Sequence, residues 1–432
     1  MTMYRLTFNF NSMIKFLKLI ALSFLLTWCP SFISAQLVGA HEDLIVIGKR
    51  DSIYSTILSE LRDIWVYVPE SARVPGKKFP VVYLLDGDAH FYSVMGMIQQ
   101  LSTVNGNSVC PEMIVVGIPN TDRTRDLTPT HVREAMGDSV FVKTSGGLPK
   151  FTSFIADELM PYIESHYPVT PYKMYIGHSL GGLAVLYAMF NRPEIFTSFV
   201  AIDPSLWWDN GVMLTMMDSL EKDAKFERKS LYLAAANTMP SGMDYSQVRK
   251  DTTQATEHLR AIIKFANSVN ARKPKGMDFK WKYYEEDNHG SVPLIATYDA
   301  LHFLFSWYAL DNNMLANYIN PGVTGSPKQL IDLLNTHFKT ISEHYGYVVL
   351  PDEHLINSLG YQFMETRKMD MAYACFDLNI KNFPQSTNVY DSMGDYYVAK
   401  GDTVKAIESF SKALEIEEVP YTRAKLKDLQ KK

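Results

Sequence analysis

The amino-acid sequence predicts an α/β protein with a mostly parallel sheet covered by helices on both faces, followed by a small all-helical segment. The first observation behind this prediction is an alternation of strand-like and helix-like segments from residue 42 to residue 312. The second is a repeat with a period of 34 residues near the C-terminus. The chain has 432 residues, of which 47% are hydrophobic, so it is long enough to bury the cores of two domains.

Short runs rich in β-branched, aromatic and other apolar residues mark the expected strands. They cover residues 63–69, 79–87, 113–118, 172–176, 198–202, 231–236 and 279–284. Helical patterns lie between most of them, at 150–164, 183–190 and 253–266, and a helix at 298–310 closes this part. Because parallel strands need a crossover segment between them, this order predicts a largely parallel sheet. We expect this domain to span residues 36–318.

The first 35 residues are typical of a signal peptide, with cleavage expected after Ala35. They hold three basic residues and no acid, followed by an apolar run at 19–28 that is short for a membrane span. We therefore expect an exported protein, periplasmic or secreted, with no membrane span in the mature chain. Lipidation at Cys29 and an uncleaved anchor are the alternatives.

Charge and cysteine content exclude several classes of function. The net charge is −5, and removal of the signal peptide would make the chain more acidic, which disfavours nucleic acids and anionic membrane surfaces as partners. Only Cys110 and Cys375 would remain, in different expected domains, so no disulfide framework is predicted. Because the sequence contains neither metal-type Cys/His spacing nor a phosphate-binding glycine loop, we expect no metal and no cofactor.

Six positions recur 34 residues apart in the C-terminal segment and match the tetratricopeptide pattern of small and aromatic residues. The first set is Ile356, Leu359, Gly360, Phe363, Ala372 and Phe376, and the second is Tyr390, Met393, Gly394, Tyr397, Ala406 and Phe410. We expect the repeats to span 346–432, after a linker and capping helix at 319–345. Two ordinary amphipathic hairpins are the alternative. Such repeats could bind a peptide or protein partner or mediate self-association, although two are fewer than the usual three.

Residues 177–182 read Gly-His-Ser-Leu-Gly-Gly and lie between the expected strand 172–176 and the expected helix 183–190. A G-x-S-x-G motif in that context is typical of a nucleophile elbow, a tight strand-to-helix turn that exposes a serine. A glycine turn that only joins a strand to a helix is the alternative. We predict that Ser179 is a nucleophile, and that the backbone N–H of Leu180 helps to form an oxyanion hole. A second N–H is expected from Gly87 or Asp88, in the loop after strand 79–87.

A serine needs a general base within hydrogen-bond reach, and His289 is the candidate because it follows the last expected strand. The acid that would orient this histidine is harder to place. It is expected after the strand 231–236, but residues 237–240 contain no carboxylate. Asp244 and Asp251 follow in the same loop and are the candidates. Asp287, or no side-chain acid at all, is the alternative.

Four ordered motifs together resemble the putative esterase family, which includes enterochelin-type siderophore esterases, S-formylglutathione hydrolases, feruloyl esterases and mycolyltransferases. The motifs are YLLDG at 83–87, RTRDLTP at 123–129, GHSLGG at 177–182 and NHGSVP at 288–293. The resemblance spans roughly residues 50–310, and it implies an α/β-hydrolase fold and ester chemistry through Ser179 and His289. The departure lies at the acid, which members of the family often place directly after the strand that ends in this chain at Ala236. The tetratricopeptide segment lies outside the family core.

Two groups of residues in expected rim loops are candidate substrate contacts. Trp207 and Trp208 could stack on an aromatic or sugar group, and Arg123 and Arg125 could hold an anionic group. The alternative is that these side chains pack in the core or brace their own loops. The sequence thus favours a serine esterase acting on a small-molecule ester, of siderophore, feruloyl or acetyl type. An acyltransferase using the same acyl-enzyme and a degenerate hydrolase that acts as a scaffold are the other hypotheses.

Overall fold

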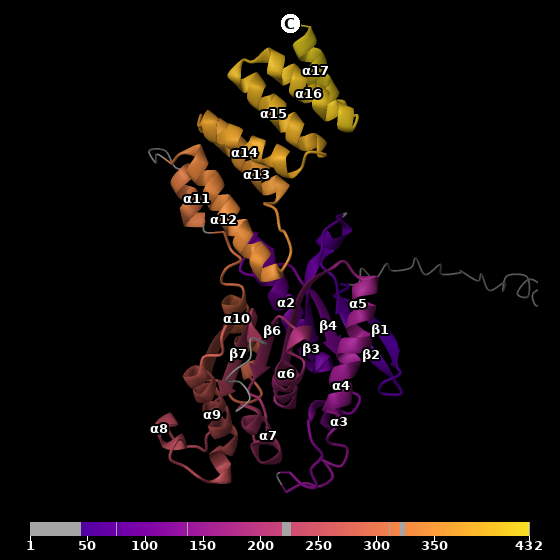
Figure 1. The fold of residues 1–432 in the computed structure, drawn as a ribbon, viewed down its shortest axis with the longest axis vertical. Coiled ribbons are helices and arrows are strands. Elements are labelled where there is room, and N and C mark those ends of the chain that lie inside the picture. The colour runs from indigo at the N-terminus through magenta and orange to yellow at the C-terminus, as the bar shows by residue number, and fades with distance from the viewer. Residues whose placement is uncertain are drawn as a thin grey trace, which may run out of the picture. The chain divides into compact units, whose positions relative to one another are not determined.

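The sheet in this computed structural model has eight strands in the order β1-β2-β4-β3-β5-β6-β7-β8 (Figure 1). The strands are β1 Lys49–Ser55, β2 Glu60–Tyr67, β3 Phe79–Leu85, β4 Ile114–Ile118, β5 Val169–His178, β6 Ser198–Ile202, β7 Lys229–Ala236 and β8 Met277–Tyr284. The pairs β1–β2 and β2–β4 are antiparallel, and every other neighbouring pair is parallel. The sequence-based expectation of a largely parallel sheet is confirmed, and β1 is an additional strand that it did not include.

The structure describes residues 45–74, 76–135, 137–217, 226–310, 312–319 and 325–431. The expected signal peptide at 1–35 lies outside these residues. The contacts of the chain divide it into residues 1–47 and 48–432, and the described strands and helices all belong to the second unit. Among the described helices, none combines the length and the apolar character needed to cross a membrane.

Helices cover both faces of the sheet, because alternate residues of the central strands point to opposite sides. On one face, Tyr83, Tyr175 and Phe199 share a core with the apolar residues of α6 and α9. On the other, residues such as Leu84 and Ile176 face α2 and α10. The helices of this part are α2 Gly87–Ser102, α3 Arg123–Leu127, α4 Leu148–Phe154, α5 Met160–His166, α6 Leu180–Asn191, α7 Trp208–Met216, α8 Tyr245–Val248, α9 Glu257–Arg272 and α10 Val292–Leu304. Because β3, β5, β6 and β7 run parallel, their C-terminal ends lie along the same side of the sheet.

The C-terminal part is all-helical and has its own core. Its helices are α11 Asn312–Ile319, α12 Pro327–Tyr345, α13 Glu353–Glu365, α14 Met369–Asn382, α15 Thr387–Lys400, α16 Thr403–Ile416 and α17 Pro420–Gln430. Leu315 of α11 packs with α12 and the following helices, so the helical part begins before the boundary expected at 318.

A repeated glycine–phenylalanine contact joins the helices of each pair. A Cβ on Gly360 would lie 2.5 Å from the Phe376 ring, and one on Gly394 would lie 2.4 Å from the Phe410 ring. The glycines therefore allow α13 to pack closely on α14, and α15 on α16, at positions 34 residues apart. The tetratricopeptide assignment, and its role in partner binding or self-association, stay predictions.

Candidate active site

Ser179 lies in a strained turn between β5 and α6. Its backbone has φ 59° and ψ −116°, a conformation that a non-glycine residue adopts only where the surrounding structure imposes it. The N–H of Ser179 donates to the carbonyl of Ile202 at 2.9 Å, which ties the turn to the end of the neighbouring strand β6. A Cβ at Gly177 would lie 2.3 Å from the carbonyl oxygen of Gly181, so only glycine fits there. This local geometry is that of a nucleophile elbow.

The loop between β8 and α10 brings His289 to Ser179. The distance from His289 Nε2 to Ser179 Oγ is 3.1 Å, which is within hydrogen-bond range. The loop itself is held by Asn237, whose N–H donates to the carbonyl of Asp287 at 2.8 Å and whose side-chain amide donates to the carbonyl of Glu285 at 3.0 Å. Asn237 follows β7, where a carboxylate was expected, and it fixes the histidine loop instead.

The carboxylate that meets His289 is Asp203, which the sequence motifs did not single out. Asp203 Oδ2 lies 2.5 Å from His289 Nδ1, and Asp203 Oδ1 accepts the N–H of Ala236 at 2.8 Å. The residue is fully buried. Burial acts to raise the pKa of this carboxyl group, but the imidazoles of His258 and His289 outweigh it and hold the pKa well below its usual range. Asp203 is therefore an ionised acceptor that faces the imidazole.

The expectation that Asp244 or Asp251 serves as the acid is corrected by their positions. Asp244 is the N-cap of α8, where its side chain accepts the N–H groups of Ser246 and Gln247. Asp251 accepts hydrogen bonds from Thr256 and Thr253, which lower its pKa to about 2. Both carboxylates are engaged in local capping and turn contacts, while Asp203 holds His289.

A sequence signal for Asp203 did exist. It directly follows the expected strand 198–202, and the chain order Ser179, Asp203, His289 is serine, acid, histidine.

The residues expected to form the oxyanion hole lie at the starts of two helices. Leu180 is the first residue of α6, and Gly87 and Asp88 are the first two residues of α2. The first N–H groups of a helix have no acceptor within the helix, so they are available to an oxyanion. Gly87 and Asp88 were expected in a loop, and the structure places them in the first turn of a helix.

The Arg123 side chain stabilises the start of α2 and does not extend into solvent toward a substrate. Its guanidinium donates to both oxygens of the buried Asp86, at 2.6 Å and 3.0 Å, and to the carbonyl of His178 at 3.2 Å. Asp86 precedes Gly87 and has a left-handed backbone with φ 51°. Burial acts to raise the pKa of Asp86, but the Arg123 guanidinium outweighs it and lowers the pKa. The expectation that Arg123 binds substrate is corrected accordingly.

Arg125 is likewise engaged within the protein. Its guanidinium donates two hydrogen bonds to the Glu60 carboxylate, at 2.9 Å and 2.5 Å, and a third to Asp126 at 2.7 Å. This confirms the alternative interpretation in which the arginine braces its own loop.

We expect Arg123→Met to lower kcat for ester hydrolysis about tenfold, because the N–H groups of Gly87 and Asp88 lose their brace. It should also reduce the free energy of unfolding by about 1–3 kcal/mol, since Asp86 would keep fewer partners for its buried charge. Steady-state kinetics and urea unfolding would measure the two effects. Arg125→Met is the matched control and should affect stability but leave kcat near that of the wild type. Equal kcat values in the two variants would contradict this role of Arg123.

The two tryptophans have different environments. Trp208 is fully buried, and its indole N–H donates to Thr130 Oγ1 at 3.2 Å, so the expectation that it contacts substrate is corrected. Trp207 is half-buried and lines an open cavity of about 470 Å³. His131, Arg133, Glu257 and His258 contribute to the same cavity. Since His258 also approaches Asp203 to 3.0 Å, this cavity lies beside the acid of the site.

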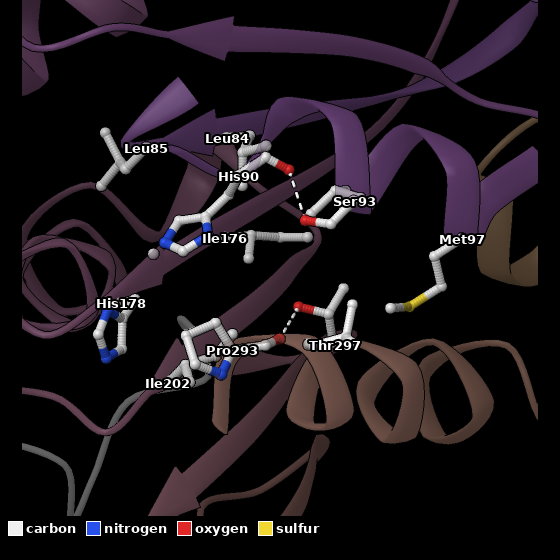
Figure 2. A pocket seen from close by; sticks show the side chains of 13 residues that line it. Leu84, Leu85, His90, Ser93, Met97, Ile176, His178, Ile202, Pro293 and Thr297 are labelled. Atoms are coloured by element: carbon white, nitrogen blue, oxygen red, sulfur yellow. Dashed lines mark hydrogen bonds between the residues drawn. The ribbon is translucent and has the colours of Figure 1, made fainter. Parts of the chain in front are cut away.

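A second, narrow pocket lies beneath the elbow, between α2 and α10. Figure 2 shows His90 and Ser93 of α2 on one side, Pro293 and Thr297 on the other, and the His178 ring at one end. Its lining is mainly aliphatic, and its free space holds no more than about one water molecule. The His178 ring centroid is 4.4 Å from that of His289. Burial, together with the nearby His289 and His90, lowers the pKa of His178 to about 4, so this ring is neutral near pH 7.

The parallel sheet, the elbow and the Ser179–His289–Asp203 arrangement define an α/β-hydrolase. Residues 55–289, more than half of the chain, match the family described as Putative esterase, and the chain belongs to that family.

Curated relatives include the siderophore enterobactin esterase of Emericella nidulans, which is 31% identical over 184 residues, covering 39% of this chain and 59% of that protein. The ferri-bacillibactin esterase BesA of Bacillus subtilis is 30% identical over 176 residues, covering 37% of this chain and 60% of that protein. The chain thus spans about three fifths of the length of these two relatives.

The chain is also similar to two proteins of solved structure. An IroE-like serine hydrolase from Shewanella oneidensis has a TM-score of 0.63 at 30% identity, covering 77% of this chain and 98% of its own. An uncharacterised protein from Capnocytophaga ochracea has a TM-score of 0.59 at 18% identity, covering 89% of this chain and 100% of its own, which shows a shared fold.

Proposed function

We propose that the protein is an exported serine esterase that hydrolyses a carboxylic ester through an acyl-enzyme on Ser179. The observation that carries the proposal is the continuous contact from nucleophile to base to acid. Ser179 Oγ lies 3.1 Å from His289 Nε2, and His289 Nδ1 lies 2.5 Å from Asp203 Oδ2. Those are the contacts that general-base activation of a serine requires.

In the first half of the proposed reaction, Ser179 Oγ attacks the ester carbonyl carbon while His289 Nε2 accepts the hydroxyl proton. The negative charge that develops on the carbonyl oxygen is stabilised by the N–H of Leu180 and that of Gly87 or Asp88. His289 then gives its proton to the leaving alkoxide, which departs as the alcohol. In the second half, water attacks the acyl-enzyme with His289 again as base, and the carboxylic acid and free Ser179 are released. Asp203 keeps the imidazole oriented and stabilises its protonated form.

We propose a siderophore ester as the substrate. The support is the agreement between the proposed chemistry and the names of two relatives, an enterobactin esterase and a ferri-bacillibactin esterase. The cavity of about 470 Å³ beside Asp203 is large enough for an aromatic ring, and it offers Trp207 for stacking and the exposed Arg133 for an anionic oxygen. Feruloyl and acetyl esters are the competing substrates.

The experiment compares iron-free and ferric catecholate trilactone siderophores with a feruloyl sugar ester and p-nitrophenyl butyrate. We expect kcat/KM for at least one trilactone to exceed that for the feruloyl and p-nitrophenyl esters by about 100-fold or more. Product analysis by mass spectrometry would show the linear acids that hydrolysis releases. Faster turnover of the feruloyl ester would reject the siderophore assignment. No turnover of any ester, together with no labelling of Ser179 by a fluorophosphonate, would reject the esterase proposal.

A further inference from the structure

Two histidines, not one, approach the same oxygen of Asp203. His289 Nδ1 lies 2.5 Å from Asp203 Oδ2, and His258 Nε2 lies 3.0 Å from it. The two imidazole rings meet edge to face, with centroids 5.4 Å apart and an interplanar angle of 88°. The usual triad accounts for only one of these rings, so His258 needs an explanation of its own.

The position of His258 is fixed by the packing of α9 against the core. It belongs to the first turn of α9, whose apolar residues Leu259 and Ile262 pack in the main core. The His258 side chain is 20% exposed and lines the cavity that also contains Trp207. Its Nε2 atom is buried and lies 3.0 Å from Asp203 Oδ2, close enough for an ion pair but not aligned as a hydrogen bond. The helix therefore presents one edge of the ring to Asp203.

Asp203 combines a strained backbone with a fully buried carboxylate that has partners at both oxygens. The residue has φ 42°, in the left-handed region that non-glycine residues rarely occupy. Asp203 Oδ1 is held by the N–H of Ala236, and Oδ2 faces the two histidines. Without His258, the carboxylate could rotate about its terminal torsion and would keep fewer polar partners for a fully buried charge. A rotated carboxylate would misalign the Nδ1–H of His289 and, through it, Nε2.

A metal ion is a poorer explanation of this cluster. Ligand atoms that share a tetrahedral Zn²⁺ at 2.0–2.1 Å stand roughly 3.3 Å apart. The two distances in this cluster, 2.5 Å and 3.0 Å, are both shorter than that separation, and the contact of His289 with Asp203 is a hydrogen bond.

We propose that His258 is a positioning residue for the acid of the site, which holds the Asp203 carboxylate in the orientation that His289 requires. The inference rests on the proposed esterase function. It predicts an effect on kcat rather than on substrate binding, because His258 acts through Asp203 and His289.

The test compares His258→Phe with His258→Gln, using His302→Phe on α10 as the control for a histidine remote from Ser179. Phenylalanine preserves the aromatic contact with the His289 ring but has no N–H group. The glutamine amide retains an uncharged N–H donor. The readouts are kcat and KM for p-nitrophenyl butyrate, the rate of Ser179 labelling by a fluorophosphonate, and the melting temperature. If His258→Phe fails to fold, His258→Met replaces it as the donor-free variant.

We expect His258→Phe to lower kcat and the labelling rate about tenfold or more with little change in KM, and His258→Gln to restore most of the loss. Wild-type rates in the donor-free variant would overturn the inference, as would a glutamine variant that is equally slow but folded. In either case an active, labelled wild type leaves the esterase proposal standing. If the wild type neither turns over esters nor is labelled, the proposed function itself fails.

Discussion

Replacing Ser179 with alanine is expected to lower kcat for ester hydrolysis by about 10³- to 10⁶-fold. The reason is that alanine has no oxygen to attack the carbonyl carbon, so the acyl-enzyme cannot form. The oxyanion donors and the substrate cavity would remain, and a small residual rate over the uncatalysed reaction is expected from them. Pre-steady-state measurements with p-nitrophenyl acetate should show a burst of nitrophenol in the wild type and none in the variant.

Ser205 supplies a matched control for the Ser179 experiment. Its hydroxyl lies 3.3 Å from Ser179 Oγ, but Ser205 is nearly fully buried and the contact of His289 Nε2 is with Ser179. We expect Ser205→Ala to change kcat by about tenfold at most, the size of effect typical of one lost hydrogen bond. If Ser205→Ala abolishes the burst while Ser179→Ala retains it, the nucleophile has been assigned to the wrong serine.

The parts of the site that could be predicted from sequence are those encoded in a short stretch of chain. The elbow depends on Gly177 and on the strand and helix that flank it, all within one local segment. His289 follows the last strand, so its order along the chain was sufficient to single it out. Local patterns likewise placed most of the strands, because burial on both faces leaves near-continuous apolar runs such as β3.

Asp203 was missed because the acid was sought only after the strand 231–236. The acid was expected after the strand 231–236, which is β7, but β7 is separated from β5 by β6 in the sheet. Asp203 directly follows β6. Because β6 pairs with β5, the strand that leads into the elbow, the Asp203 side chain lies next to the elbow. The contact between Asp203 and His289 joins residues 86 positions apart, and residue patterns do not encode such long-range contacts. The same limitation explains Arg123, whose partner Asp86 lies 37 positions earlier in the sequence.

The second large effect is expected from Asp203→Asn, which should lower kcat by about 10³- to 10⁴-fold with a small change in KM. The amide has no negative charge to stabilise the imidazolium that forms when His289 accepts the serine proton. Its NH₂ group can also donate to His289 Nδ1, which would place the proton of neutral histidine on Nε2, the atom that must accept from Ser179. Steady-state kinetics with near-ultraviolet circular dichroism would separate this effect from unfolding.

Asp244→Asn and Asp251→Asn are the controls, because both residues were plausible acids from their place in the chain. Their carboxylates cap or brace the segment around α8, and Asp203 is the carboxylate that meets His289. We expect both variants to keep kcat within about threefold of the wild type, as for surface changes that do not touch the reacting groups. If either one loses activity while Asp203→Asn retains it, the acid would have to be reassigned. If all three variants retain activity, His289 must be held without a carboxylate, as in a serine–histidine dyad whose imidazole is oriented by backbone carbonyls or water.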